Sequence, residues 1–283
     1  MARHRPRQSL DPATVLSAYA VGVFPMADAR DAPGVYWVEP RQRAILPLDG
    51  FHLSRSLRRT LKSERFRLTA DTAFDEIIAM CAEAATDRPE TWINHSIERV
   101  FRQLHIAGFA HSIECWEGDS LVGGLYGLAL GRAFFGESMV SRTTDASKAA
   151  LAALVARLRV GGFTLLDCQF MTDHLASMGA VEIERADYVA LLGDALSEVL
   201  GAAAAGDSWA VGAGDYRRDD RAGAVAGGAD LVVMAQAWHA EQGAADRLSE
   251  SRYDRCQGCV PEIGVRRGDN ARNSWRHIES CRL

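Results

Sequence analysis

Hydrophobic residues recur every three or four positions in some segments and alternate or run continuously in others, which predicts a protein of mixed helices and strands. The clearest helix is expected at 96–107, where apolar residues line one side and Gly108 follows the last turn. Residues 19–25 are expected to turn the chain. Further helices are expected at 11–20, within 51–66, and at 72–85, 146–158, 171–178 and 185–200, and strands at 35–38, 44–46, 67–70, 110–116, 120–130, 133–135, 163–166 and 180–183.

The stretch 131–172 is organised as strand, helix and strand, an order that suggests a crossover placing both strands in one sheet. The first strand runs into Glu137, and the second ends in Asp167-Cys168-Gln169. Each strand thus delivers an acid at or near its end. We therefore expect Glu137, Asp167 and Gln169 to converge on one cleft, which is where ligands usually bind such sheets.

Each of these polar residues also has a simpler interpretation. Glu137 directly follows Gly136, so it can be an exposed turn residue as well as a ligand-binding carboxylate. Asp167 and Gln169 lie two residues apart on an extended segment and share one face. Such a pair can orient a nucleophilic amine or merely tie down a loop. Cys168 points the other way and is interpreted as a small buried hydrophobic residue rather than a nucleophile.

The segment 51–66 is strongly basic, with Glu64 as its only acid. Its leucines recur at helical spacing, which predicts an amphipathic helix with a cationic face. The pattern fits a solvated helix face and a phosphate-contacting surface equally well. The residues that would contact phosphates are Arg55, Arg58, Arg59 and Lys62.

The composition is that of a globular protein. The 283 residues are 48% hydrophobic and carry a net charge of −5, which does not indicate general nucleic-acid binding but can conceal a local basic patch. No apolar run reaches the ~18 residues of a membrane span, and the basic N-terminus lacks the apolar segment of a signal peptide. The cysteines of the main body have no framework spacing, which suits a reducing cytoplasm. We expect a cytoplasmic protein without a membrane partner.

Three regions are expected: an N-terminal domain at 1–70, a catalytic domain at 71–200 and a poorly ordered extension at 201–283. The last boundary follows a change in composition, because Gly, Ala and Asp dominate after position 200. The tail contains Cys256-x-x-Cys259, His277 and Cys281, but this spacing is irregular for zinc. No metal site is expected, and no glycine-rich phosphate loop occurs.

An ordered set of short motifs resembles the bacterial leucyl/phenylalanyl-tRNA–protein transferases. No single motif is specific, but the set covers roughly 12–192 in the right order. The matching stretches are 19–25 (YAVGVFP), Trp37 with Pro40 and 43–44, 52–56, 91–93, 108–114 (GFAHSIE), 121–127 (LVGGLYG), 136–142 (GESMVSR), 146–148, 167–169, and 173–174 with 177–180.

The resemblance implies an aminoacyltransferase that moves Leu or Phe, and Met less well, from aminoacyl-tRNA to the N-terminal Arg or Lys of a protein. The modified protein is thereby marked for degradation by the N-degron pathway. The implied fold is α/β (α+β), with a small N-terminal domain and an N-acetyltransferase-like domain whose mixed sheet is flanked by helices. Because the tRNA brings an activated ester, no cofactor is expected, and we expect a monomer.

The resemblance also assigns roles to individual residues. Asp167 and Gln169 match a catalytic pair that positions and deprotonates the acceptor amine, and Glu137 matches an acid near the bound aminoacyl-adenosine. The basic segment falls where the family binds the tRNA acceptor arm. The remaining matches are binding-site tryptophans at Trp37 and Trp92, and an apolar pocket for the donor side chain at Leu125, Leu151, Leu154 and Leu166.

Two other functions compete with this assignment. An acetyl-CoA-dependent N-acetyltransferase of the same fold would need a glycine-containing pyrophosphate loop before the central helix, and residues 141–147 (SRTTDAS) contain no glycine. A non-catalytic RNA-binding protein would keep the basic helix but would leave Glu137, Asp167 and Gln169 unexplained. Aminoacyl transfer accounts for all of these residues.

Overall fold

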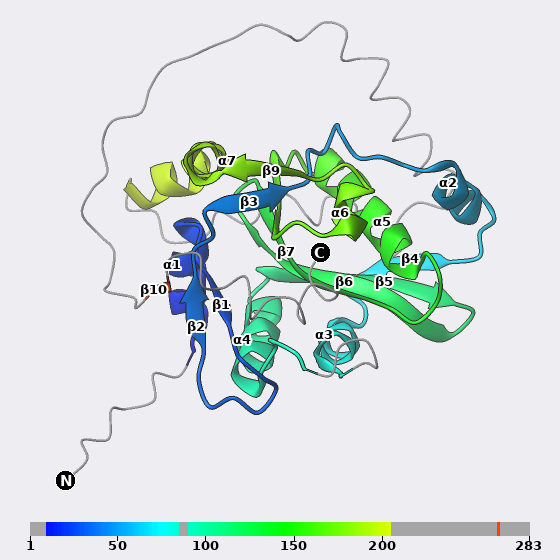
Figure 1. The fold of residues 1–283 in the computed structure, drawn as a ribbon, viewed down its shortest axis with the longest axis horizontal. Helices are drawn as coiled ribbons and strands as arrows, with labels where there is room; N and C mark the ends of the chain where they lie inside the picture. The colour runs from blue at the N-terminus through cyan, green and yellow to red at the C-terminus, as the bar shows by residue number, and fades with distance from the viewer. Residues whose placement is uncertain (1–9, 85–89, 205–264, 267–283) are drawn as a thin grey trace, which may run out of the picture.

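A computed structural model describes residues 10–84, 90–204 and 265–266 (Figure 1). Its helices are α1 (Pro12–Ala20), α2 (Arg55–Lys62), α3 (Phe74–Ala82), α4 (His95–Ile106), α5 (Ala146–Val160), α6 (Asp173–Ala176) and α7 (Arg185–Ala204). Its strands are β1 (Phe24–Met26), β2 (Tyr36–Val38), β3 (Gln42–Ile45), β4 (Arg67–Ala70), β5 (Ala110–Glu117), β6 (Ser120–Leu130), β7 (Ala133–Ser141), β8 (Leu165–Gln169), β9 (Val181–Glu184) and β10 (Val265–Arg266).

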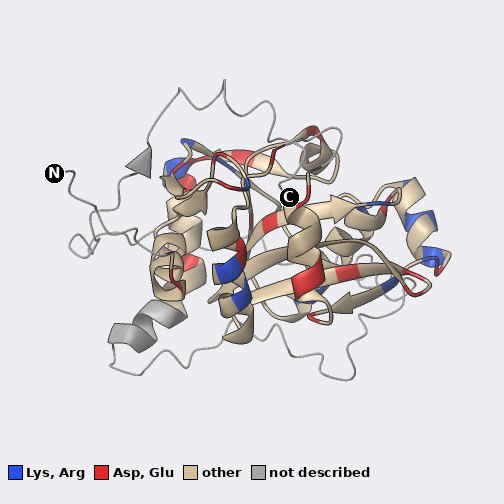
Figure 2. Cartoon of the chain, turned by 90° about the horizontal axis from the view of Figure 1, so that it is seen from below, with Lys and Arg blue, Asp and Glu red and all other residues tan. Residues whose placement is uncertain are grey.

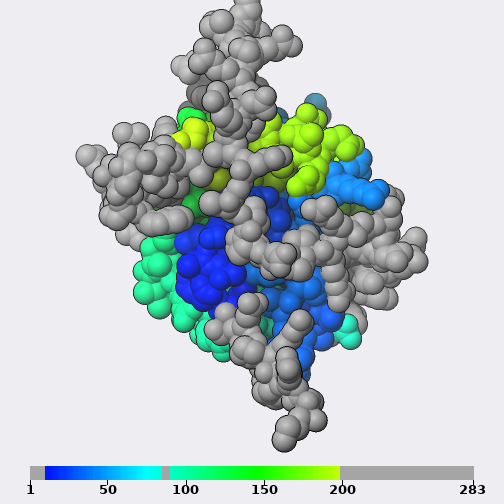
Figure 3. All heavy atoms as spheres, turned by 90° about the vertical axis from the view of Figure 1, so that its left-hand side faces the viewer, coloured from blue at the N-terminus to red at the C-terminus, as the bar shows by residue number. Residues whose placement is uncertain are grey.

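The main sheet has seven strands in the order β4-β5-β6-β7-β8-β3-β9. Within this sheet only β7 and β8 pair in parallel, and α5 provides the crossover between them. A smaller sheet joins β1, β2 and β10. The expected mixed sheet with flanking helices and a small N-terminal unit is therefore confirmed. Figure 3 shows the side where the N-terminal elements (blue) lie beside β9 and α7 (yellow-green).

Two hydrophobic clusters form the core, one on each face of the main sheet. Helix α5 packs on one face, and α1, α3, α4 and α7 contribute to the cluster on the other. Two adjacent glycines of β6 allow this close packing. A Cβ at Gly123 would lie 2.8 Å from the Cβ of Ala146 in α5, and a Cβ at Gly124 would lie 2.3 Å from Cδ1 of Ile77 in α3. Glycine is thus needed here for the approach of helices to both faces.

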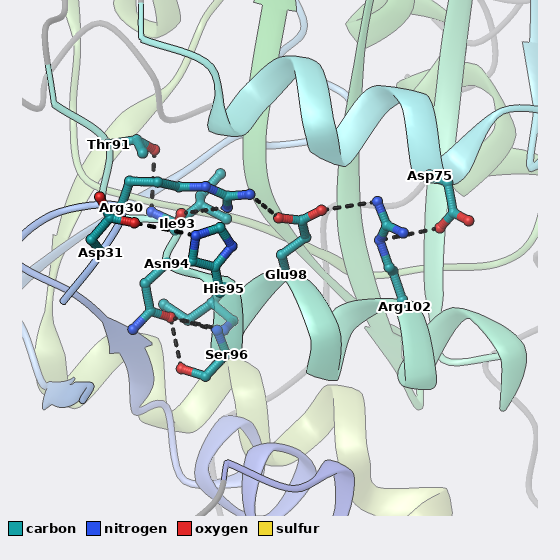
Figure 4. Close-up of polar contacts among 11 residues, drawn as sticks. Arg30, Asp31, Asp75, Thr91, Ile93, Asn94, His95, Ser96, Glu98 and Arg102 are labelled. Carbon is teal, nitrogen blue, oxygen red and sulfur yellow. Dashed lines mark hydrogen bonds and ion pairs between the residues drawn. The ribbon is translucent and has the colours of Figure 1, made fainter. Parts of the chain in front are cut away.

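The start of α4 is held by polar contacts that Figure 4 shows. Asn94 caps the helix, because its Oδ1 accepts hydrogen bonds from the backbone N–H groups of Ser96 and Ile97. Its Nδ2 donates to the carbonyls of Ala32 and Gly34 in the loop before β2. One turn later, Glu98 lies between two arginines and pairs with Arg30 of that loop and with Arg102 of α4. These contacts fasten the N-terminal loop to α4.

Most predicted elements are present, with two corrections. Residues 19–25 do not only turn the chain, because Phe24–Met26 forms β1 and pairs antiparallel with β2. The strand expected at 133–135 continues to Ser141, so Glu137 lies within β7 and not beyond its end. The strands β3 and β4, expected in the domain at 1–70, belong to the main sheet.

Nearly all of the expected extension at 201–283 lies outside the described residues, as do its cysteines and His277. Within the described part, none of the helices combines the length and apolar character needed to cross a membrane.

Asp71 joins β4 to β5 through its carboxylate, which accepts hydrogen bonds from Nδ1 of His111 (2.8 Å) and from the backbone N–H of Ser112 (2.9 Å). Burial alone raises the pKa of Asp71, but the contacts with His111, the N–H of Ser112 and His105 together outweigh this effect and leave the pKa below its ordinary value of 3.8. The ionised carboxylate therefore stabilises the fold.

We expect Asp71→Asn to make the free energy of unfolding depend less on pH in the acidic range. The stabilisation by the charge is complete above the ordinary pKa and is lost as pH falls through the lowered pKa of the folded state. The free energy of unfolding, measured by denaturant titration at about pH 6 and at about pH 3, should therefore differ between wild type and variant mainly at the higher pH. An equal difference at both pH values would contradict this prediction.

Candidate active site

Asp167 lies in the middle of β8 and is held by four hydrogen bonds. Arg43 of β3 binds it in bidentate fashion, with Nε 2.8 Å from Oδ1 and Nη2 2.6 Å from Oδ2. Tyr188 of α7 donates its hydroxyl to Oδ2 (2.8 Å), and the backbone N–H of Gln169 donates to Oδ1 (2.8 Å). The Asp167 side chain has no exposed surface, and that of Arg43 is only 2% exposed. A carboxylate has about four acceptor positions, so Asp167 is saturated.

Arg43 is itself enclosed on every side. Its Nη1 donates to the carbonyl of Gly22 (3.0 Å), and its guanidinium lies between the rings of Phe24 and Tyr188, 4.6 and 4.5 Å from their centroids. Burial alone lowers the pKa of Arg43, but Asp167 reverses this effect and the pKa is raised, so the side chain stays cationic. Burial raises the pKa of Tyr188 well above its ordinary value, which keeps the hydroxyl protonated and able to donate.

Gln169 has a backbone conformation that is unusual for a residue other than glycine. Its φ is +65°, and a 2.7 Å hydrogen bond from the N–H of Phe170 to the carbonyl of Cys168 closes a three-residue turn around it. This is the pattern of the rare γ-turn with positive φ, which is strained. Such strain persists only where the surroundings impose it, and it is concentrated at functional sites.

Glu137 is positioned by a β-bulge. Gly136 pairs with Gly127 of β6 and Ser138 pairs with Tyr126, so Glu137 is the additional residue of β7. Its Oε1 accepts hydrogen bonds from the hydroxyl of Tyr19 in α1 (2.7 Å) and from Nε2 of Gln169 (2.8 Å). Glu137 is completely buried, so its interpretation as an exposed turn residue is wrong.

The structure thus brings Glu137, Asp167 and Gln169 together, as expected, but all three are enclosed and none faces an open cleft. Sequence reasoning did not assign the residues that hold them. Tyr19 and Arg43 lie in stretches that resemble the family, and this resemblance is the one feature of the sequence that could have pointed to them. Tyr188 lies in no such stretch. We call the set the carboxylate network: Tyr19, Arg43, Glu137, Asp167, Gln169 and Tyr188.

The four predicted pocket leucines also come together. They are completely or almost completely buried in the hydrophobic cluster that lies against α5. Leu166 and Asp167 are consecutive in β8 and therefore point to opposite faces of the sheet. Cys168 belongs to the same hydrophobic cluster, and burial raises its pKa, so it is not an activated thiol. Within this hydrophobic cluster we call the four predicted residues the leucine cluster: Leu125, Leu151, Leu154 and Leu166.

The two tryptophans belong to the opposite cluster, which also contains Tyr19. Trp92 is completely buried just before α4, and its carbonyl accepts a hydrogen bond from the N–H of Ala27 (3.1 Å). Trp37 is half-buried in β2 and packs against the same cluster. Both therefore share a core with Tyr19 of the carboxylate network.

The basic segment forms α2, as predicted. The hydroxyl of Ser54 caps the helix, and Leu57 and Leu61 are buried beneath it. The exposed side of α2 is cationic at one end of the molecule (Figure 2). Thr60 donates a 3.0 Å hydrogen bond to Asp145 at the start of α5, which links α2 to the crossover helix. The cationic side chains are Arg55, Arg59 and Lys62, which are exposed, and Arg58, which is half-buried.

Among the described residues, no three His, Cys, Asp or Glu side chains are grouped so that they could hold a metal ion.

Comparison with known proteins identifies the family. Residues 45–193 match the family described as leucyl/phenylalanyl-tRNA protein transferase, and residues 8–41 match the N-terminal domain of the same family. The chain is 63% identical to the leucyl/phenylalanyl-tRNA–protein transferase of Rhizorhabdus wittichii over 199 residues, which cover 70% of this chain and 80% of that protein. Identity to the transferase of Paramagnetospirillum magneticum is 62%, over 65% of this chain and 88% of that protein. The chain therefore belongs to the leucyl/phenylalanyl-tRNA–protein transferase family.

Proposed function

We propose that this enzyme transfers Leu or Phe, and Met less well, from aminoacyl-tRNA to the N-terminal Arg or Lys of acceptor proteins. The observation that carries the proposal is the strained Gln169, held between Asp167 and Glu137 in a buried network. Membership of the transferase family disfavours both alternatives, N-acetylation from acetyl-CoA and RNA binding without catalysis.

The reaction requires a neutral amine to attack an ester carbonyl. A C–N bond forms, the ester C–O bond breaks, and the ribose oxygen of the tRNA leaves with a proton. Gln169 suits the positioning of the amine, because its Nε2 donates to Glu137 and its carbonyl is the end of the amide that accepts an N–H. Asp167 is saturated, so it acts through Gln169 and not directly on the amine.

Both substrates need access to an enclosed site. Gln169 has no exposed surface, so contact with the amine requires neighbouring side chains to move when the substrates bind. The acidic side chain of Glu137 suits a cationic acceptor, because it accepts a hydrogen bond from Gln169 and lies beside the proposed position of the amine. Trp37 and Trp92, in the core shared with Tyr19, are proposed to contact the aminoacyl end of the donor.

The leucine cluster suits the donor side chain. Leu and Phe are apolar and unbranched at Cβ, and a leucine-lined pocket would receive either without any polar partner. The family match supports this use of Leu125, Leu151, Leu154 and Leu166.

The tRNA is proposed to lie on α2. A polyanion needs a basic surface, and although the net charge of the whole protein is −5, α2 provides exposed arginines and a lysine.

The modified acceptor would enter the N-degron pathway in the cytoplasm, with the enzyme acting as a monomer and without a metal or cofactor. The division into an N-terminal domain, a catalytic domain and an extension at 201–283 is part of the same proposal, except that β3 and β4 of the region 1–70 lie in the main sheet with the catalytic domain.

Gln169→Ala and Asp167→Asn should slow transfer without weakening tRNA binding. Loss of a positioning or proton-accepting group costs roughly 10²–10⁴-fold. The measurement is the single-turnover rate of radiolabelled Leu transfer from Leu-tRNA to a protein with N-terminal Arg, with a filter-binding isotherm for the same variants. Exposed Gln103→Ala and Asp119→Asn are matched controls that should retain the wild-type rate. Wild-type rates for both site variants, or a defect confined to tRNA binding, would refute the site.

Replacing Arg55, Arg58 and Lys62 by Ala should weaken aminoacyl-tRNA binding and flatten its salt dependence. Each lost phosphate contact removes roughly 0.9 from the slope of log affinity against log salt for a duplex arm. Arg99→Ala, on the exposed side of α4, is the control and should leave the slope unchanged. An unchanged slope in the triple variant would make α2 a solvated helix face.

Leu151→Trp should reject Phe before it rejects smaller donors, because the added ring fills the deep end of the pocket. One such change usually discriminates by only ~1–3 kcal/mol. The measurement is kcat/KM with Leu-, Met- and Phe-tRNA. Leu104→Trp, buried in the cluster on the opposite face, is the matched control and should affect all donors equally. Equal losses for Leu151→Trp would show that Leu151 is ordinary core.

A further inference from the structure

We infer that Arg43 and Tyr188 are positioning residues for aminoacyl transfer, which fix Gln169 in its reactive orientation through Asp167. This inference rests on the proposed function. Neither residue touches a reacting atom in the proposed reaction. Their effect passes through one carboxylate to the backbone and side chain of Gln169.

The first step is the position of the carboxylate. A carboxylate bound through one oxygen can rotate, but Arg43 binds both oxygens of Asp167 in parallel. Oδ1 is the same atom that accepts the N–H of Gln169. The guanidinium therefore determines where this N–H must point.

The second step is the backbone of Gln169. Its φ of +65° is unfavourable for a glutamine and would relax without a restraint. The hydrogen bond to Asp167 restrains the backbone, and the bond from Nε2 to Glu137 restrains the side chain. A bulge in the pairing of β3 with β8 lies at the same place, since Ala44 pairs with Gln169 and Ile45 with Asp167. Cys168 is the additional residue, so ladder pairing does not impose the orientation by itself.

The third step is the enclosure of Arg43. Tyr188 covers one face of the guanidinium and also donates to Oδ2 of Asp167, so it fixes both partners of the ion pair. Gly22 makes room for this arrangement. A Cβ at Gly22 would lie 2.8 Å from Cε1 of Tyr188, and its φ of +79° is one that glycine adopts readily. The turn after α1, strand β3 and helix α7 thus meet at one guanidinium.

Tyr188→Phe is the sharpest test, because it removes one hydroxyl and keeps the ring on Arg43. We expect its single-turnover rate to fall by about three- to tenfold, and that of Arg43→Lys by about 10–100-fold, since misplacement of a reacting group by about 1 Å can cost 10²-fold. The Kd for Leu-tRNA should stay within about twofold of wild type, so the defect lies in kcat and not in KM. Arg43→Lys keeps the positive charge, so its rate should exceed that of Arg43→Met.

The control breaks an ion pair elsewhere. Glu98→Ala disrupts the contacts with Arg30 and Arg102 that Figure 4 shows, and should lower Tm while the rate per folded molecule stays at the wild-type value. All rates are measured well below Tm. If Arg43→Met does not fold, Tyr188→Phe decides the outcome.

Wild-type rates for Tyr188→Phe and Arg43→Lys, alongside a slow Gln169→Ala, would overturn this inference and leave the proposed function intact. Losses that merely follow the folded fraction, as in Glu98→Ala, would also overturn it. A wild-type rate for Gln169→Ala would instead count against the proposed site itself.

Discussion

The buried ion pair between Arg43 and Asp167 is the constraint on which the rest of the site depends. Removing two charges from water is costly, and the pair is tolerated only where hydrogen bonds satisfy the remaining polar atoms. The carbonyl of Gly22, the hydroxyl of Tyr188 and the N–H of Gln169 do so here. Deleting one partner of such a pair typically costs about 3–5 kcal/mol. The elements around it are therefore placed by electrostatics as much as by hydrophobic packing.

The main sheet separates a polar environment from an apolar one at β8. Strands β7 and β8 pair in parallel only as far as Phe135 and Asp167, while β7 continues to Ser141. One face of β8 presents Asp167 to the carboxylate network, and the other presents Leu166 to the leucine cluster. Under the proposed function, an acyl donor with an apolar side chain and a polar reacting end would need both environments, which lie on the two faces of β8 at the end of this pairing.

Local pattern predicted the helices, the crossover and the meeting of Glu137 with Asp167 and Gln169, because strand order and side-chain period are local properties. The residues that hold the site, and the burial of Glu137, depend on contacts between residues that are distant in sequence. Arg43 and Asp167 are 124 residues apart, and Tyr19 and Glu137 are 118 apart. The bulge that buries Glu137 is set by the register of β7 against β6, which residue 137 and its neighbours do not encode. Thus Glu137, which its neighbours in sequence suggest to be an exposed turn residue, is buried within a strand.

Gly123 and Gly124 have a consequence for how this enzyme can diversify. Helices α5 and α3 contact the two sides of β6 with no side chain between. Neither helix can therefore move closer to the strand, and a larger residue at Gly123 or Gly124 would break the packing. The separation of helix and sheet is a fixed spacing. If the proposed donor pocket lies against α5, a change in donor size would depend on the side chains that α5 directs toward the sheet, while the distance between helix and sheet stays the same.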